Sequence, residues 1–324
     1  MAGEASRNRM SWTMARGAID YYADHSVERS DLPIVFHGGG EPMTNHEVVR
    51  QAVEYVQRLA DERGRRPFFR ISTNGVYPAE RARWVARTFG HVSLGLDGPP
   101  DVHDRQRPAH GGGGTYDAVS RTLRILQESG ALQLVNTVIT PGSVERMVEI
   151  VQHFHDLGIK KVRLQPMAHC GRCGTTDVER LDPDRYIENL RLARATARSL
   201  GIQIASFCEQ TTYHTNHYCG GCGLNLVVSW DGRIGSCHEA LDPSYAPAAE
   251  LLFGRVDDAT GAVEVDWGRI RALRGRTYDL FDECRTCAYR TNCAGGCLIR
   301  AARSNGTVMS IDTEWCQLVM RALT

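Results

Sequence analysis

Hydrophobic and polar residues alternate with two different periods between residues 11 and 200. Apolar runs of strand length occur at 32–36, 68–71, 92–96, 132–139 and 161–164. Amphipathic patterns with helical spacing lie around them, at 11–25, 45–63, 79–89, 116–129, 144–157 and 183–200. Strands that alternate with helices of this length predict an α/β fold, with a parallel sheet built from right-handed crossover units.

Local sequence signals predict where two helices begin, and the first predicted helix lacks a strand before it. Thr44 and Glu47 have the spacing of a capping box, and Asp182 before Pro183 predicts an N-cap followed by proline at the first helical position. Each later helix before residue 160 follows a strand, but the helix predicted from Ser11 follows a short polar segment. We therefore expect the α/β domain to begin without its first strand.

The pattern changes after residue 205. Helical periodicity fades, and short segments rich in glycine, cysteine and turn residues follow, with a hairpin turn predicted at 230–232 (Trp-Asp-Gly). Small loop-rich domains of this kind are often stabilised by metals. We predict two domains, residues 1–204 and 205–324.

Composition and charge exclude several classes of partner. The 324 residues contain 38 basic and 38 acidic side chains, which leaves a net charge of zero and no footprint for nucleic acid or an anionic membrane. No apolar run approaches the roughly 20 residues that span a bilayer, and the polar start does not resemble a signal peptide. We expect a cytoplasmic protein with neither nucleic acid nor a membrane as partner.

Eight of the 11 cysteines form a spaced pattern in the last third of the chain. They lie as Cys219-x2-Cys222-x14-Cys237 and then as Cys284-x2-Cys287-x5-Cys293-x3-Cys297-x18-Cys316. A reducing cytosol disfavours disulfides, and clustered cysteines there more often bind metal. Eight thiolates suit two cubane iron–sulfur clusters, and Cys-x2-Cys pairs also form structural zinc sites.

Three further cysteines lie outside this pattern. Cys170 and Cys173, beside His169, either bind a metal, react with a substrate or are free thiols in a loop. For Cys208 we expect a buried thiol.

A glycine-rich segment follows the first predicted strand. Residues 36–42 read Phe-His-Gly-Gly-Gly-Glu-Pro. Glycines there let the backbone approach a ligand closely, while a proline stiffens the exit. Taken alone, such a loop is equally a tight turn.

In context, the glycine segment and the cysteine order resemble those of radical S-adenosylmethionine (radical SAM) enzymes that carry a carboxy-terminal SPASM domain. The resemblance rests on the GGEP motif, on Asp97-Gly98-Pro99 with His103-Asp104 and Arg107, and on the eight cysteines. It spans residues 10–320 and implies a partial (β/α)6-type barrel followed by a cluster-binding domain.

The resemblance also implies site residues. For S-adenosylmethionine they are Gly39, Gly40, Glu41, Pro42, Ser72, Asn74, Asp97, Asn136 and Gln165. For one auxiliary [4Fe-4S] cluster they are Cys219, Cys222, Cys237 and Cys297, and for the other Cys284, Cys287, Cys293 and Cys316. Ligand binding at strand carboxyl ends is the rule in parallel α/β folds.

Three features depart from the family pattern. No cysteine precedes Cys170, so the C-x3-C-x2-C motif that holds the SAM-cleaving cluster is absent. The alternatives are a truncated chain and a non-catalytic relative, and we expect the chain alone not to cleave the cofactor. Gly95 stands where many relatives have a serine. His238 stands where anaerobic sulfatase-maturating enzymes have a catalytic aspartate; it is either a base or a histidine packed beside a cluster.

The function implied by the resemblance is the modification of a ribosomally made peptide by a 5′-deoxyadenosyl radical, through a crosslink or a side-chain oxidation. Such a maturase also needs a reductant such as flavodoxin or ferredoxin. Two alternatives stay open: a non-catalytic iron–sulfur protein that transfers electrons or docks a precursor, and a small-molecule dehydrogenase of the same architecture.

Overall fold

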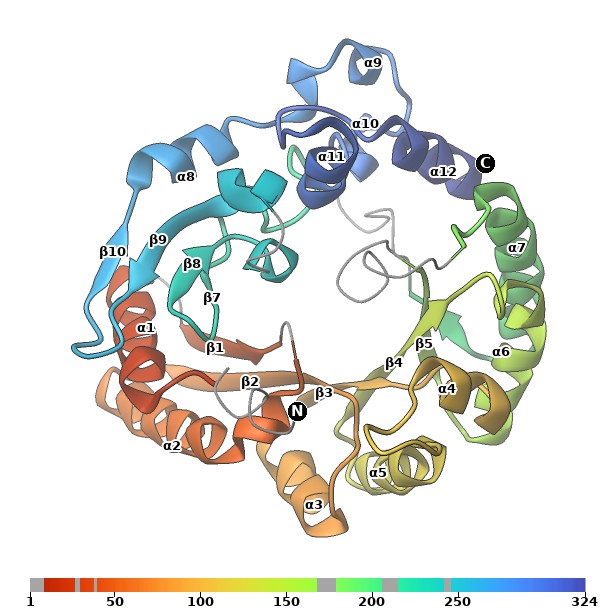
Figure 1. The fold of residues 1–324 in the computed structure, drawn as a ribbon, viewed down its shortest axis with the longest axis horizontal. Coiled ribbons are helices and arrows are strands. Elements are labelled where there is room, and N and C mark those ends of the chain that lie inside the picture. The colour runs from red at the N-terminus through yellow and green to blue at the C-terminus, as the bar shows by residue number, and fades with distance from the viewer. Residues whose placement is uncertain are drawn as a thin grey trace. The chain divides into compact units, whose positions relative to one another are not determined.

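The computed structural model describes residues 9–26, 30–37, 40–167, 179–205, 215–241 and 246–323. Its first part alternates strands and helices (Figure 1). The elements are α1 (Trp12–His25), β1 (Asp31–Phe36), the 3-10 turn η1 (Pro42–Asn45), α2 (His46–Glu62), β2 (Arg66–Thr73), α3 (Ala79–Thr88), β3 (His91–Gly95), α4 (Pro100–Gln106), α5 (Tyr116–Glu128), β4 (Leu132–Ile139), η2 (Val144–Arg146), α6 (Met147–Asp156), β5 (Lys161–Pro166), α7 (Pro183–Ser199) and β6 (Gln203–Ile204).

These strands form one six-stranded sheet in the order β1-β2-β3-β4-β5-β6. Strands β2 to β6 pair in parallel. The predicted α/β fold with a parallel sheet is therefore confirmed, and β1 lies at one edge of the sheet.

Register divides β2–β5 into two faces. The helix-covered face is apolar and buried, with Ile71, Leu94, Val135 and Leu164 among its residues. Figure 1 shows α3, α5, α6 and α7 along this side of the strands. Because side chains alternate along a strand, the intervening residues point to the other face, which we call the open face. The open face contains Ser72, Ser93, Gly95, Asn136, Arg163 and Gln165.

Local chemistry explains where some predicted elements begin. The Asp182 carboxylate caps α7 by accepting from the backbone N–H groups of Asp184 and Arg185, as predicted. The predicted capping box at Thr44 is wrong: the Thr44 hydroxyl donates to the Glu41 carbonyl, and α2 begins after Asn45 without a side-chain cap. The residues before α2 close a 3-10 turn instead, which uses the hydroxyl that the box would need.

The carboxy-terminal region contains a second, four-stranded antiparallel sheet in the order β10-β9-β8-β7. Its elements are β7 (Val227–Val228), β8 (Arg233–Gly235), η4 (His238–Leu241), η5 (Ala246–Leu251), β9 (Leu252–Val256), β10 (Val263–Val265), α8 (Trp267–Arg274), η6 (Tyr278–Leu280), α9 (Asp282–Arg285), α10 (Arg290–Cys293), α11 (Leu298–Asn305) and α12 (Thr313–Leu323). The predicted hairpin turn joins β7 to β8, with Gly232 at φ 83°, a value that favours glycine.

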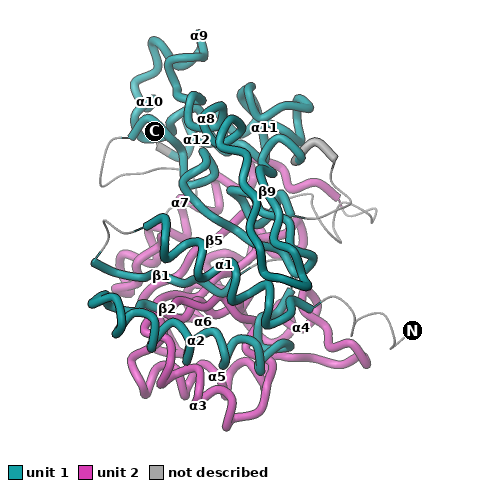
Figure 2. Tube along the Cα trace, turned by 90° about the vertical axis from the view of Figure 1, so that its left-hand side faces the viewer, with its two compact units in different colours: residues 1–68, 208–324 teal, residues 69–207 magenta. Residues whose placement is uncertain are grey.

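The chain divides into two compact units that differ from the predicted domains (Figure 2). Residues 1–68 and 208–324 form one unit, and residues 69–207 form the other. The division near residue 207 lies close to the predicted boundary, but the amino-terminal segment groups with the carboxy-terminal region. The reason lies in α1, whose Met14 packs into the apolar core of that region.

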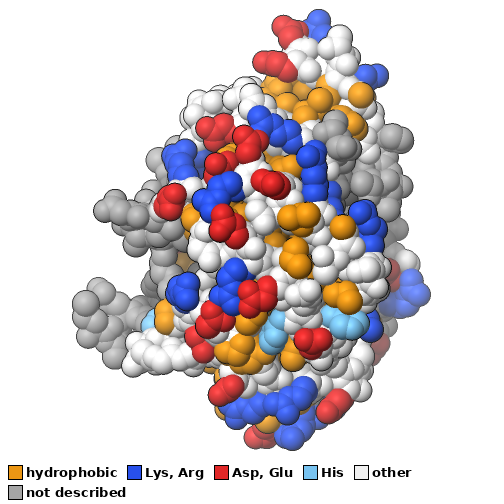
Figure 3. All heavy atoms as spheres, turned by 90° about the vertical axis from the view of Figure 1, so that its right-hand side faces the viewer, with side chains coloured by type: hydrophobic (Ala, Val, Ile, Leu, Met, Phe, Trp, Pro, Cys, Tyr) orange, Lys and Arg blue, Asp and Glu red, His pale blue; other side chains and the backbone are white. Residues whose placement is uncertain are grey.

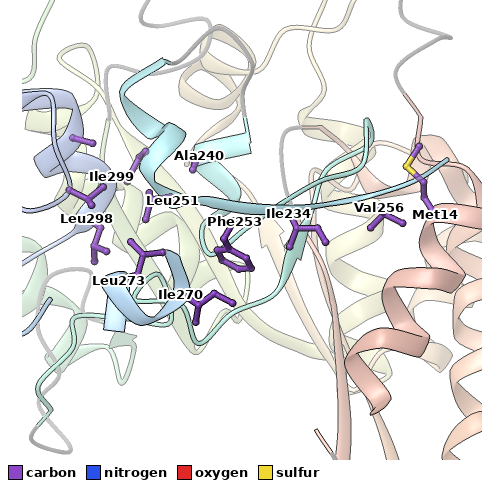
Figure 4. Packing of buried hydrophobic residues seen from close by; sticks show 12 residues of the cluster. Met14, Ile234, Ala240, Leu251, Phe253, Val256, Ile270, Leu273, Leu298 and Ile299 are labelled. Carbon is purple, nitrogen blue, oxygen red and sulfur yellow. The ribbon is translucent and has the colours of Figure 1, made fainter. Parts of the chain in front are cut away.

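This core, the central cluster of the first unit, joins α1 to the antiparallel sheet and to α8 and α11 (Figure 4). Its buried members are Met14, Ile234, Ala240, Leu251, Phe253, Val256, Ile270, Leu273, Leu298, Ile299, Ala302 and Val308. Backbone contact adds to it: a Cβ on Gly17 would lie 2.0 Å from the Gly261 carbonyl oxygen, so only glycine lets α1 approach this closely.

Acidic and basic side chains are interspersed on the face shown in Figure 3, which agrees with the zero net charge. Among the described residues, no helix is both long and apolar enough to cross a membrane.

Candidate functional site

The eight patterned cysteines all lie in the unit formed by residues 1–68 and 208–324, and all eight have free thiols. Short turns position them. The backbone N–H of Cys222 donates to the Cys219 carbonyl, and that of Cys287 donates to the Cys284 carbonyl. Each Cys-x2-Cys pair is thus folded into a turn that brings two thiols to one side.

Burial disfavours the thiolate form of these side chains. It raises the pKa of Cys219 to about 11 and the pKa of Cys237 to about 12. It also raises the pKa of Cys284 to about 11 and that of Cys293 to about 12. In the metal-free protein these groups are therefore neutral thiols, and metal binding must release their protons.

Electrostatic interactions among the cysteines follow the two predicted sets. Thiolate charge on Cys297 disfavours ionisation of both Cys219 and Cys237. In the other set, Cys316 and Cys287 disfavour ionisation of Cys284 and of Cys293. Like charges act in this way over short distances in a protein, so these cysteines lie within electrostatic reach of others in their predicted set.

One five-residue segment, the Cys293–Cys297 loop, links the two sets. It follows α10 and turns sharply through three residues with positive φ: Ala294 at 49°, Gly295 at 77° and Gly296 at 76°. Ala294 is the only non-glycine residue with positive φ among those the structure describes. Strain at such a position persists where the surroundings fix it, and it clusters at functional sites.

The glycine segment lies only partly within the described residues. Gly39 is outside them, and Gly40 is exposed. Glu41 begins η1, where its side-chain oxygen accepts from the Met43 N–H at 3.0 Å, and Pro42 is the first residue of the turn. The motif therefore builds a compact turn after β1.

Two histidines meet in this unit. The ring of His37, beside the glycine segment, lies 4.1 Å from the ring of His238 between centroids, tilted by 49°. Desolvation by the surrounding protein lowers the pKa of His238, although the Glu239 carboxylate acts in the opposite direction. Glu239 in turn forms an ion pair with Arg303 at 2.8 Å. His238 is thus an exposed residue, with a partly desolvated ring that favours its neutral form, next to the predicted ligand Cys237.

Three predicted cofactor-binding residues share the open face of the other unit. Ser72, Asn136 and Gln165 lie on β2, β4 and β5 and point to the same side of the sheet. Arg163 joins them and donates to the Asn136 amide oxygen at 3.4 Å. Asn74 follows β2, and its side-chain oxygen accepts from the Val76 N–H at 2.9 Å.

Asp97 is placed differently: it is 1% exposed and is bound within the protein. Arg107 donates to both carboxylate oxygens, at 2.8 Å and 3.1 Å, and the Val138 N–H donates to one of them at 3.0 Å. The imidazole of His103 accepts from the Asp97 N–H at 3.2 Å. The DGP…HD..R segment is therefore a hydrogen-bonded network that fixes Arg107 beside the open face.

Some chemistry-bearing residues were missed by the sequence interpretation. Arg163 and the buried Arg276 have no motif around them, and arginine is uninformative where all but two of the 38 basic residues are arginine. His37 lies within the 36–42 segment, but nothing there connects it to His238. Strand alternation from Gln165 could have revealed Arg163. The predicted features His169, Cys170, Cys173 and Cys208 lie outside the described residues.

Comparisons with known proteins agree with this geometry. Residues 7–157 match the family model of the radical SAM superfamily. The chain is 24% identical over 288 residues to the serine-type anaerobic sulfatase-maturating enzyme of Klebsiella pneumoniae, covering 86% of this chain and 71% of that protein. It is 18% identical over 281 residues to the cysteine-type enzyme of Clostridium perfringens, covering 80% and 72%.

Solved structures show the same fold. Native anSMEcpe with bound AdoMet superposes with a TM-score of 0.72 at 16% identity, covering 97% of this chain and 87% of that one. Streptococcus suis SuiB bound to precursor peptide SuiA superposes with a TM-score of 0.62 at 15% identity, covering 94% and 69%. The chain thus contains a radical SAM domain and is a radical SAM enzyme homologous to the anaerobic sulfatase-maturating enzymes.

Proposed function

We propose that this protein modifies a ribosomally made peptide by radical chemistry, forming a crosslink or oxidising a side chain, with two auxiliary [4Fe-4S] clusters in its carboxy-terminal region. The observation that carries the proposal is that the eight patterned cysteines lie in one unit as free thiols and interact electrostatically within the two predicted sets. Relatives whose structures hold a peptide, such as SuiB with SuiA, support a peptide as the substrate class.

The donor set suits iron–sulfur clusters. Among the described residues, no group of three or more His, Cys, Asp or Glu side chains is arranged to hold a single metal ion. A zinc ion needs all its thiolates about 2.3 Å from one centre, whereas a four-iron cluster has ligands spread around a larger body. The buried Ser236 hydroxyl, which has no hydrogen-bond partner among these residues, lies next to Cys237 and supplies a donor for a sulfur atom. The Ser236 hydroxyl and the number and order of the eight thiols favour clusters over zinc.

The chain's own residues bind, orient and exclude water. When bound, thiolate-ligated clusters accept and donate single electrons, and S-adenosylmethionine supplies the radical. The turn at Glu41 and the open face with Asn136 and Gln165 offer polar groups for the cofactor. His238 is our candidate to accept a proton from the substrate, because it is an exposed residue beside Cys237 whose imidazole lies against that of His37.

The residues of this chain fit the SAM-binding cluster less well than they fit the auxiliary clusters. The radical SAM family implies a [4Fe-4S] cluster there, but no cysteine precedes Cys170, so the sequence contains no C-x3-C-x2-C set for it. We derive no step through that cluster. The second candidate function is a non-catalytic iron–sulfur protein that docks a precursor peptide or transfers electrons, because all eight thiols for the auxiliary clusters lie within one unit.

The first experiment tests the clusters. We expect anaerobically reconstituted protein to hold about eight irons per chain, with the visible absorbance of iron–sulfur clusters. One or two equivalents of zinc without visible absorbance would contradict the proposal.

The second experiment separates the two functions. The reduced, reconstituted protein is incubated with S-adenosylmethionine and a precursor peptide encoded near its gene. The peptide mass and 5′-deoxyadenosine are then measured. A peptide that changes mass together with the release of 5′-deoxyadenosine supports the maturase. Peptide binding with no 5′-deoxyadenosine and no change in mass, also after a C-x3-C-x2-C segment is added upstream, supports the docking protein.

A third experiment addresses His238 in a preparation that turns over. We expect His238→Gln to lower turnover by roughly 10²–10⁴-fold with the iron content unchanged, the usual loss when a general base is removed. His110→Gln is the matched control, because His110 is an exposed loop residue of the other unit. Unchanged turnover in His238→Gln would assign His238 a packing role.

A further inference from the structure

Arg276 is a fully buried cation in the carboxy-terminal region. It is 1% exposed and lies between α8 and η6. Its guanidinium donates to carbonyl oxygens of two segments. These are Gly295 at 3.0 Å, Gly296 at 3.3 Å, Ser310 at 2.8 Å, and Val308. Its carbon also lies 4.9 Å from the centroid of the Phe281 ring. Five contacts therefore fix one charged group.

None of these contacts supplies a negative charge. Among the described residues, the groups whose negative charge would favour the charged form of Arg276 are the cysteines that a bound metal deprotonates: Cys297, Cys284, Cys219 and Cys293. Burying a cation without a counter-ion costs far more than carbonyl hydrogen bonds return. An anion held close to this position would offset that cost.

The location of Arg276 relates it to both cysteine sets. Two of the thiolates, Cys219 and Cys297, belong to the first predicted cluster, and Cys284 and Cys293 belong to the second. The carbonyls of Gly295 and Gly296 lie inside the Cys293–Cys297 loop, which contributes one ligand to each set. The Ser310 carbonyl belongs to the segment that leads to Cys316.

We propose that Arg276 is the shared counter-ion of the two auxiliary clusters and the positioning residue of the loop that joins them. A cubane core bound by four thiolates is an anion in both of its working oxidation states, and it becomes more negative on reduction. One buried positive charge near both clusters favours the reduced form of each. The inference rests on the proposed clusters and adds a residue outside their ligand set.

The reduction potential is the property that distinguishes this role from a structural one. Net charge and hydrogen bonding around a cluster set its potential. Loss of the Arg276 charge makes both clusters harder to reduce, so both midpoint potentials shift to more negative values. A residue that only packed the loop would change stability without moving both potentials together.

The experiment compares three variants of the reconstituted full chain without S-adenosylmethionine. Arg276→Gln removes the charge, and Arg276→Lys keeps it with fewer donors. Arg285→Gln is the matched control, because Arg285 adjoins Cys284 but is 67% exposed and paired with Asp282. Iron content, unfolding by urea and the midpoint potentials of both clusters, followed by electron paramagnetic resonance, are measured for each.

We expect Arg276→Gln to shift both midpoint potentials to more negative values. Arg276→Lys should keep potentials close to those of the parent protein but lose stability. Arg285→Gln should change neither the potentials nor the stability. Unchanged potentials in an iron-loaded Arg276→Gln, or a shift of one cluster alone, would overturn the shared role. If Arg276→Gln does not load iron, the result for Arg276→Lys decides. Full iron loading of Arg276→Lys supports the role of the positive charge, and equal failure to load iron overturns that role. A parent protein without clusters would instead refute the proposed function.

Discussion

The Arg107 guanidinium occupies the volume that a side chain at Gly95 would need. A Cβ built on Gly95 lies 2.6 Å from Arg107 Nη1 and 3.0 Å from Arg107 Cζ. Arg107 is held there by Asp97, whose carboxylate it contacts at 2.8 Å. Gly95, where the family resemblance predicts a serine, is therefore paired with an arginine whose guanidinium occupies the space of that side chain.

We expect Gly95→Ser to destabilise the unit formed by residues 69–207 by about 1–3 kcal/mol, as for overpacking of a fitted site. The new side chain must push the guanidinium away from Asp97. The free energy of unfolding, measured with urea, checks this. Gly90→Ala is the control, because a Cβ there meets nothing within 4 Å. Equal stability of Gly95→Ser and the parent protein would show that Arg107 moves aside without cost.

Asp97 and Asp101 form a matched pair of arginine-bound carboxylates. The Asp97 side chain is 2% exposed, whereas that of Asp101, paired with Arg146, is 54% exposed. We expect Asp97→Asn to cost about 1.5–3 kcal/mol, the range for hydrogen bonds to charged groups. Asp101→Asn should cost less than about 1 kcal/mol, because water screens an exposed pair. Urea unfolding of both variants tests this, and similar costs would contradict the role given to burial.

His103 makes stability depend on pH. It is fully buried, and desolvation lowers its pKa below the ordinary value of 6.5. Its imidazole accepts from the Asp97 N–H and donates to the Thr115 hydroxyl, which itself donates to the Arg107 carbonyl. The network needs the neutral ring.

The unfolded chain binds the His103 proton more tightly than the folded protein does. The contribution of His103 to the free energy of unfolding is therefore complete above about pH 6.5, and it is lost as the pH falls towards the lower pKa of the folded protein. Desolvation of His153 acts in the same direction on its pKa. Urea unfolding between pH 8 and pH 5 should show stability falling with pH, with a smaller slope in His103→Asn. An NMR titration that places the pKa of His103 at or above 6.5 would contradict this.

Removal of iron should destabilise the two units unequally. We expect Cys293→Ser to lose about four irons per chain and to weaken the unit that holds the cysteines, because a metal site contributes to folding free energy. Amide hydrogen exchange should then rise around α9–α11 and stay constant in β3–β5. Cys208→Ser, outside both sets, is the control. An equal increase in the exchange rate throughout the chain would contradict local stabilisation by a cluster.

The strands β2–β5 could be predicted because their apolar residues form runs of strand length between helical patterns. Helix α4 and strand β6 could not be predicted. Helix α4 has only seven residues and begins with a proline at its first position. Strand β6 has two residues and exists only through its pairing with β5. Such short elements depend on tertiary contacts, which leave no periodic signal in the sequence.

The candidate site was predictable where spacing carries the chemistry. Cysteine spacing indicated two sets of thiols, but nothing near Arg276 distinguishes it from the many other arginines. Its place depends on carbonyl groups of residues 295–310, which any amino acid could supply. The pairing of His37 with His238 likewise joins residues 201 positions apart, with no local signal to connect them.

The alternation of the two sheet faces limits which changes in chain length the sheet can accept. On β4, Asn136 and Val138 lie on the open face and Thr137 and Ile139 on the covered one. Deleting a single residue upstream within this strand would exchange the two groups, burying an amide under the helices and exposing an aliphatic side chain. Insertions and deletions among homologues should therefore fall in connecting segments, such as the glycine run 111–114. Within β4 they should involve two residues at a time, because two residues restore the alternation of the faces.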